Sequence, residues 1–360
     1  MLKKIDQYII TKFLGAFFYT ILLFAAMAVV IDISERIDDF MEKEAPFYLI
    51  ITEYYFNFVP YIIFLLAPLF IFIAVIFFTS QMASRSEIVA TFGSGISFYR
   101  LLLGPYLFSA TFLVLLQLFA NHYWVPRANA TKIEFENQYV RGKYINTDRN
   151  IHIQIDPENY IYVETYNNRD TSARKFTLER FVDKKMVYKL SSDRLKYMNN
   201  LKKWRVESYV ERKIDSLQEK VIRGNVLDTA IGLSPADFDR RTNYKEAMTT
   251  PELQEFIAKE RMKGAPFVEF YEVELYRRTA IPFATFILTL IGFSIASRKV
   301  RGGMGLHIAV GVAISAAYIL FLQFSTTYAT NGTLSPLLSV WIPNIIFGIL
   351  SIYLMLKAQK

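Results

Sequence analysis

The sequence contains no cysteine and only three histidines, and long stretches of it carry no charge. Without cysteine there is no disulfide bond and no thiolate metal site, while the redox state of the compartment stays open. His122, His152 and His307 are not spaced as a metal-binding pair. The sequence also has no zinc-protease motif and no serine nucleophile elbow. These absences argue against a hydrolytic enzyme or a resident metal.

A phosphate-binding loop is missing as well. Gly142-Lys143 is followed by Tyr144 and lacks the leading glycine of such a loop. We therefore expect no ATPase site and no cofactor in this chain. If the protein works against a gradient, the energy has to come from a partner.

The charged residues are concentrated in one part of the 360-residue chain. Residues 127–278 hold 29 of the 41 Lys/Arg and 24 of the 33 Asp/Glu. This segregation predicts a membrane protein with one large soluble insert. The formal net charge is +8, but no basic stripe or binding motif accompanies it, so nucleic acid is not an expected partner.

Uncharged runs predict six membrane spans, since a helix needs roughly 20 apolar residues to cross the hydrocarbon. The last run, Gly302–Leu356, is too long for one helix and breaks at Asn331-Gly332 and Pro336, which are turn signals. The expected spans are Phe13–Ile31, Tyr54–Ser84, Leu101–Pro126, Thr279–Ser297, Gly305–Ser325 and Leu337–Leu356.

Loop charges predict the direction of the spans. Lysine or arginine occurs in both termini and in the loops after the second and fourth spans, as Lys3, Lys4, Lys12, Arg85, Arg100, Arg298, Lys299, Arg301, Lys357 and Lys360. The loop after the first span holds seven acidic residues against Arg36 and Lys43. We therefore expect cytoplasmic termini and place the insert on the opposite, periplasmic side.

The insert has the pattern of a β-domain. Ile151, Ile153 and Ile155 alternate with polar residues, and further short β-rich runs are separated by turn residues. This spacing predicts a small antiparallel sandwich or roll. After it, Thr250 is expected to cap a helix that runs to about Met262 and ends at Gly264. The predicted division is 1–126 with spans 1–3, 127–278 as the insert, and 279–360 with spans 4–6.

A short cytoplasmic segment near residues 84–97 is partly amphipathic and contains Gly93 and Gly95. Its chemistry alone favours an ordinary helix lying on the membrane surface. A coupling helix that sits in a groove of an ATPase is the other interpretation.

Several ordered motifs resemble those of the LptF/LptG family of lipopolysaccharide-export permeases. They are Asp6-Gln7-Tyr8-Ile9, Ser86-Glu87-Ile88-Val89-Ala90 with Gly93 and Gly95-Ile96-Ser97, Arg100-Leu101 with Pro105, Asn121 with Pro126-Arg127-Ala128-Asn129, Glu274-Leu275-Tyr276-Arg277-Arg278, Leu290-Ile291-Gly292, Arg301-Gly302-Gly303 and Trp341-Ile342-Pro343-Asn344. The resemblance covers the whole chain, and the start and the acidic first loop are more similar to the LptG type.

The resemblance implies a permease of an ABC-type export complex in the bacterial inner membrane. The expected fold has six transmembrane helices and a periplasmic antiparallel β-jellyroll-like domain between spans 3 and 4. The expected partners are a second LptF/LptG-type permease, two copies of an LptB-type ATPase that binds the ATP, an LptC-type membrane-anchored protein, a periplasmic LptA-type bridge, and lipopolysaccharide itself.

The resemblance also implies two sets of site residues. One would couple the permease to the ATPase: Ser86, Glu87, Ile88, Ala90, Thr91 and Gly93. The other would line the lipid cavity and its gate between spans 1 and 5: Arg36, Lys43, Gly311 and Ser315. LptG-type permeases tend to have lysines at the outer end of span 1 that meet lipid phosphates. Here that end is acidic, so a solvated loop, a substrate with fewer phosphates and bridging divalent ions all stay open.

Two alternatives are considered. The first is a different ABC-type permease of the lipoprotein-release kind, but such permeases usually have four spans, and the six predicted here argue against it. A membrane-anchored receptor or scaffold with a ligand-binding periplasmic β-domain would need no ATPase, and copurification of a nucleotide-binding subunit separates it from an exporter.

Overall fold

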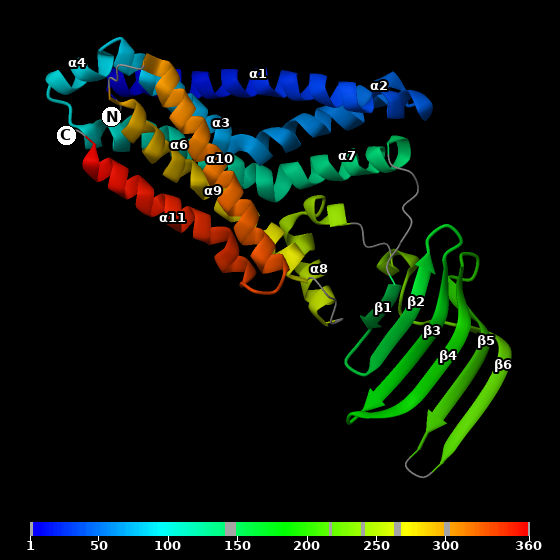
Figure 1. Ribbon diagram of the computed structural model, residues 1–360. Coiled ribbons are helices and arrows are strands. Elements are labelled where there is room, and N and C mark those ends of the chain that lie inside the picture. Colours follow the sequence, from blue (N-terminus) through cyan, green and yellow to red (C-terminus); the bar gives the residue numbers. More distant parts are fainter. Residues whose placement is uncertain are drawn as a thin grey trace. The chain divides into compact units, whose positions relative to one another are not determined.

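A computed structural model describes residues 3–140, 149–215, 218–238, 242–262, 268–298 and 303–358 (Figure 1). The predicted helix end at Gly264 and the basic residues Lys299, Arg301 and Lys360 lie outside this part. The chain divides into two compact units. The first comprises Met1–Val140, Lys245–Leu253 and Glu269–Lys360, and the second comprises Arg141–Tyr244 and Gln254–Val268. Residues 127–140 of the predicted insert belong to the first unit.

Helices form the first unit. Their bounds are α1 (Lys4–Glu42), α2 (Phe47–Leu49), η1 (Ile50–Tyr55), α3 (Phe56–Ser84), α4 (Glu87–Gly93), α5 (Phe98–Leu101), η2 (Leu102–Tyr106), α6 (Leu107–Phe119), η3 (Ala120–Trp124), α7 (Val125–Tyr139), η5 (Thr242–Glu246), α8 (Thr250–Met262), α9 (Val268–Ala296), α10 (Gly303–Thr330) and α11 (Pro336–Lys357). Three of these helices are shared with the second unit, which includes the start of η5, most of α8 and the first residue of α9.

Six helical stretches of the described chain are long and apolar enough to cross a membrane. They are α1, α2 to α3, α5 to α7, α9, α10 and α11, and each covers one of the six predicted spans, with Ser297 of the fourth lying one residue past the end of α9. The predicted break in the last uncharged run is also confirmed. Gly332 has a φ of +77°, and Ser335 caps α11 by accepting a hydrogen bond from the Leu338 amide.

The spans differ greatly in how much of their surface the chain covers. In their most apolar windows, most residues of α3 and α9 are buried, whereas few residues of α1 and α10 are. Along its whole length α1 still buries a row of side chains that includes Ile9, Phe13 and Phe17. A core cluster joins α1, α3, the α4–α5 region, α6 and α9 through apolar side chains such as Phe13, Ile71, Ile88, Leu113 and Phe293. Both termini lie at the same end of the bundle as α4, and α2 lies at the other end (Figure 1).

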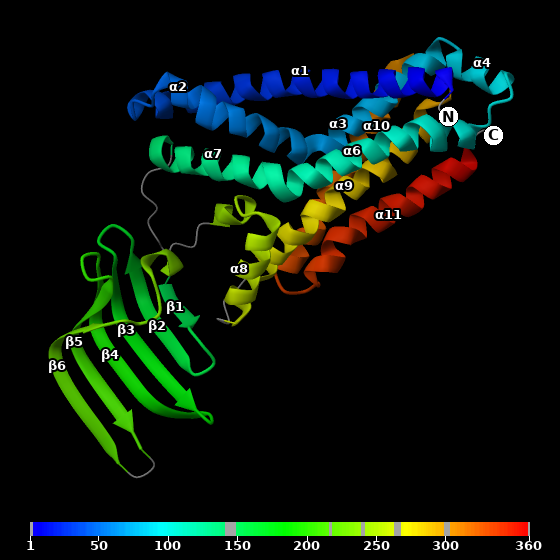
Figure 2. The same ribbon diagram turned by 180° about the vertical axis from the view of Figure 1, so that it is seen from behind.

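The second unit contains one antiparallel sheet. Its strands are β1 (Arg149–Gln154), β2 (Asn159–Asn167), β3 (Ser172–Val182), β4 (Lys185–Met198), β5 (Lys203–Ile214) and β6 (Glu219–Thr229). They pair in sequence order as a meander, so the roll is one bent sheet rather than two facing sheets (Figure 2). The six-stranded sheet between spans 3 and 4 confirms the predicted fold class.

One face of the sheet carries an apolar core. Ile151, Ile153, Val163 and Val206 are buried there, as the period-two pattern predicts. The following chain, including η4 (Pro235–Phe238), covers this face. The indole of Trp204 donates a hydrogen bond of 2.7 Å to the Leu233 carbonyl, which fixes this covering segment.

Candidate functional site

The short helix α4 has two distinct faces. Ile88 is fully buried and Thr91 nearly so, and they hold α4 against the bundle. Glu87, Ala90 and Gly93 lie three residues apart on the other face, where Ala90 and Gly93 are exposed and the Glu87 side chain is 32% exposed. A Cβ added at Gly93 would meet no atom within 4 Å, so the packing of this chain does not require glycine there.

The start of α4 is strained. Ser86 precedes the helix with a φ of +62°, a left-handed conformation that residues other than glycine and asparagine rarely adopt. The Glu87 carboxylate accepts a hydrogen bond of 3.1 Å from the Tyr8 hydroxyl of α1 and lies 4.0 Å from the Arg85 guanidinium. The turn therefore presents Glu87 in a fixed position.

A second contact ties the start of α1 to the segment after α4. Arg100 donates a hydrogen bond of 2.6 Å to the buried carboxylate of Asp6. The guanidinium lies across Gly104, where an added Cβ would be 2.0 Å from an Arg100 nitrogen. A larger residue at position 104 would require the Arg100 side chain to shift, so the Asp6–Arg100 pair and Gly104 fit one another in this conformation.

The acidic C-terminal end of α1 is packed into the bundle. Asp32 is buried and accepts hydrogen bonds from Arg36 at 2.9 Å, Tyr54 at 3.0 Å and Tyr55 at 3.1 Å. Arg36 also lies 3.9 Å from Glu136 of α7. A buried carboxylate needs such partners, and here Arg36 is one of them.

Lys43, the other basic residue predicted to meet lipid, has a capping contact instead. Its Nζ donates a hydrogen bond of 2.8 Å to the Val140 carbonyl, just past the end of α7. Arg36 and Lys43, the two basic residues predicted at the lipid cavity, thus each have a partner within this chain. Either would have to exchange that partner to meet a phosphate.

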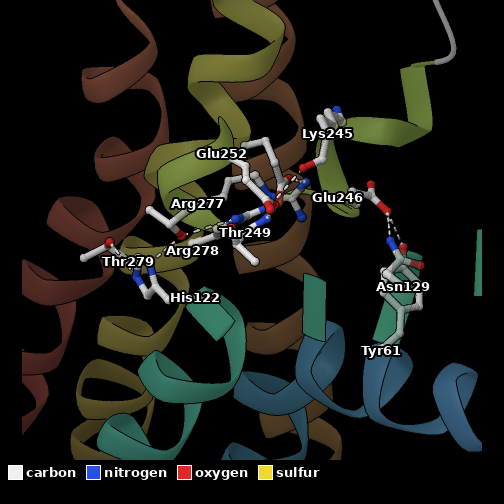
Figure 3. A network of polar contacts seen from close by, with 12 residues as sticks. Tyr61, His122, Asn129, Lys245, Glu246, Thr249, Glu252, Arg277, Arg278 and Thr279 are labelled. Carbon is white, nitrogen blue, oxygen red and sulfur yellow. Dashed lines mark hydrogen bonds and ion pairs between the residues drawn. The ribbon is translucent and has the colours of Figure 1, made fainter. Parts of the chain in front are cut away.

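A polar network joins the segment after the β-domain to the span bundle (Figure 3). Arg278 of α9 is buried and donates to the Lys245 carbonyl at 2.9 Å and to the Thr250 hydroxyl at 3.2 Å. His122 binds the same Thr250 hydroxyl at 2.8 Å. Glu246 accepts a hydrogen bond of 3.0 Å from Tyr61 of α3. Residues 245–250 are therefore held by three different spans.

This network corrects the predicted cap of α8. The cap is Thr249, whose amide donates to the Glu252 carboxylate at 2.8 Å and whose carbonyl accepts from the Leu253 amide. The hydrogen bond from the Thr249 amide lowers the pKa of the Glu252 carboxyl. Thr250, predicted as the cap, uses its hydroxyl for His122 and Arg278 instead. Lys245, just before α8, is partly buried, and this burial lowers the pKa of its ammonium group.

A comparison with models of protein families shows which family the chain belongs to. The model described as lipopolysaccharide export system permease LptF/LptG matches residues 7–357. The chain belongs to the LptF/LptG family. It is thus a multi-pass inner-membrane protein and a lipopolysaccharide-export permease, a class of transporters rather than enzymes, and family membership implies an export complex with partners. No curated protein matches the chain.

The small residues predicted at the gate of this LptF/LptG permease lie in an intramolecular contact. A Cβ added at Gly311 of α10 would be 2.3 Å from Cδ1 of Ile76 on α3. Ser315 is buried, and its hydroxyl donates to the Gly311 carbonyl at 2.9 Å. Glycine is needed here for α10 to approach α3 of the same chain.

The exposed side of α10 carries a different set of small residues. They are Gly305, Ala309, Ala313 and Ala316. The sequence analysis assigned Gly311 and Ser315 to the gate, because composition does not show which way each small residue of the span points. The Arg278 network was also missed, although two adjacent arginines at the start of an uncharged run were a visible signal.

Proposed function

We propose that this LptF/LptG permease is the membrane half of an ABC-type exporter driven by a separate ATPase. The observation that carries the proposal is the two-faced α4. Ile88 anchors the helix, while the opposite face presents the partly exposed Glu87 and the exposed Ala90 and Gly93, at the end where both termini lie. A partly exposed carboxylate on a fixed helix suits a charge-assisted contact with a basic group of an ATPase.

In this proposal two LptF/LptG-type chains pair and bind two LptB-type ATPase subunits. The gate lies between the exposed α1 of one chain and the exposed small-residue face of α10 of the other. Close helix approach in lipid depends on small side chains, because lipid supplies no hydrophobic drive. The β-domain passes lipopolysaccharide to an LptC-type protein and an LptA-type bridge.

Reconstitution tests the function. The chain, purified with its partner permease and ATPase and placed in liposomes with lipopolysaccharide, is expected to release lipid only while ATP is hydrolysed. The alternative is a receptor or scaffold. It would be favoured if the purified chain bound a ligand through its β-domain, copurified with no nucleotide-binding subunit and moved no lipid.

The proposed orientation has cytoplasmic termini and a periplasmic β-domain. Because the chain has no cysteine, single cysteines can report it. We expect Asp193→Cys, exposed on β4, to react with an impermeant thiol reagent in cells with a permeabilised outer membrane, and Ser84→Cys, exposed at the end of α3, to react only after lysis. Equal labelling of the two before lysis would refute the orientation.

A further inference from the structure

A groove runs between α3, α9 and α10 on the span bundle. Its walls are mostly apolar, and it encloses about 230 Å³, far more than the roughly 10–15 Å³ that one water needs. The apolar side chains that line it include Leu65, Leu69, Ile281, Leu288, Ile319 and Leu322. Pro68 also lies in the wall and cannot donate a hydrogen bond within α3.

The groove is about one leaflet deep. On α9 it extends from Arg277 to Leu288, and on α10 from Ser315 to Thr326. At a rise of about 1.5 Å per residue, each wall is about 16 Å long. Half of the roughly 30 Å hydrocarbon core has nearly the same depth. An acyl chain of one leaflet therefore matches the groove in length and polarity.

Arg277 marks one end of the groove. Its Nε is buried and has no hydrogen-bond partner within the part of the chain that the structure describes. Glu274 lies 3.9 Å from another Arg277 nitrogen, but the same carboxylate is closer, at 3.4 Å, to Arg278. Arg278 is further satisfied by the Lys245 carbonyl and Thr250. Arg277 is therefore the less neutralised of the two cations.

A cation at the edge of the hydrocarbon is costly unless it meets an anion or water. The Arg277 side chain is 28% exposed, so a phosphate can meet the accessible guanidinium nitrogens that its buried Nε leaves at the groove. A groove of this size with one cation at its end can hold one acyl chain and one phosphate. This argues for a bilayer phospholipid rather than the larger, multi-chain cargo.

We propose that the groove between α3, α9 and α10 binds one anionic phospholipid, with its phosphate on Arg277 and one acyl chain along Leu69, Ile281 and Ile319. The site goes beyond the export function, because its ligand is a lipid of the surrounding bilayer. All three helices line it, and the bound acyl chain fills the space between them.

Native mass spectrometry of the full-length protein tests the site. The protein is purified from nanodiscs of phosphatidylcholine containing phosphatidylglycerol, and bound lipid is counted as detergent activation is raised. We expect one phosphatidylglycerol to be retained, Arg277→Gln to reduce its retention about tenfold, and Arg277→Lys to restore most of it. Arg127→Gln removes an exposed arginine at the same end of the bundle and should change nothing.

A second variant addresses the acyl chain. Leu322→Trp places a larger side chain in the groove while Arg277 itself is unchanged, and it should also release the lipid. Circular dichroism and gel filtration report whether the protein is folded. Phosphatidylglycerol retained equally by wild type, Arg277→Gln and Leu322→Trp would overturn the proposal. So would Arg277-dependent retention of lipopolysaccharide in place of phospholipid when both are supplied, since the groove would then belong to the cargo.

Discussion

Glu87→Arg is expected to stop ATP-driven lipid export while the chain stays folded and inserted. The Glu87 side chain is partly exposed, so the substitution buries no new charge, and Ile88 and Thr91 still anchor α4. The new arginine would lie beside Arg85 and oppose the basic group that we propose on the ATPase. A charge-assisted contact contributes about 1.5–3 kcal/mol, so its loss corresponds to about tenfold or more in affinity. The readouts are copurified ATPase, ATP hydrolysis and lipid release in liposomes.

Two matched variants separate coupling from packing within the chain. Tyr8→Phe removes the internal hydrogen bond to Glu87 and leaves the carboxylate on the outer face. It should therefore export nearly as well as wild type. Gly93→Leu adds bulk to the outer face, where the chain leaves open space, and should weaken ATPase binding without destabilising the fold. Normal export by Glu87→Arg, or an equal defect in Tyr8→Phe, would contradict the assigned role.

Gly311→Leu and Ala313→Leu are expected to fail in different ways. At Gly311 even a Cβ overlaps Ile76, so a leucine would push α10 away from α3. Overpacking of this kind costs typically about 1–3 kcal/mol and more where backbones must separate. We expect less folded protein and a lower thermal midpoint in detergent. Ala313 is exposed on α10, so Ala313→Leu should fold normally and lose crosslinks between α10 and α1 of the partner permease, together with export.

Compensation inside the chain checks this assignment. The double variant Gly311→Leu with Ile76→Ala makes room on α3 and should regain part of the folded yield. Ala313→Leu should gain nothing from the same change on α3. Normal export and crosslinking by Ala313→Leu would show that this face of α10 is not at the gate. A stable, inserted Gly311→Leu protein would show that α10 does not depend on this contact.

Hydropathy predicted the six spans and the break at Gly332, because a helix in lipid must satisfy its own backbone and therefore needs a continuous apolar run. Period-two alternation predicted the β-domain, because successive strand residues face opposite sides. The order of the strands in the sheet could not be predicted, since it depends on which strands pair. The N-cap of α8 is Thr249 rather than the predicted Thr250. The hydroxyl of Thr250 contacts His122 and Arg278, which are distant in sequence.

The sequence by itself determined the class of this protein: a six-span membrane chain with one β-rich insert and the ordered motifs of the LptF/LptG family. These are properties of composition, period and local order. Only the tertiary structure decided what single side chains face. It placed Gly311 against Ile76, joined Arg36 to Asp32, and left Arg277 at the end of an apolar groove. The orientation of a side chain is fixed by packing between segments that are far apart along the chain, and no local pattern encodes it.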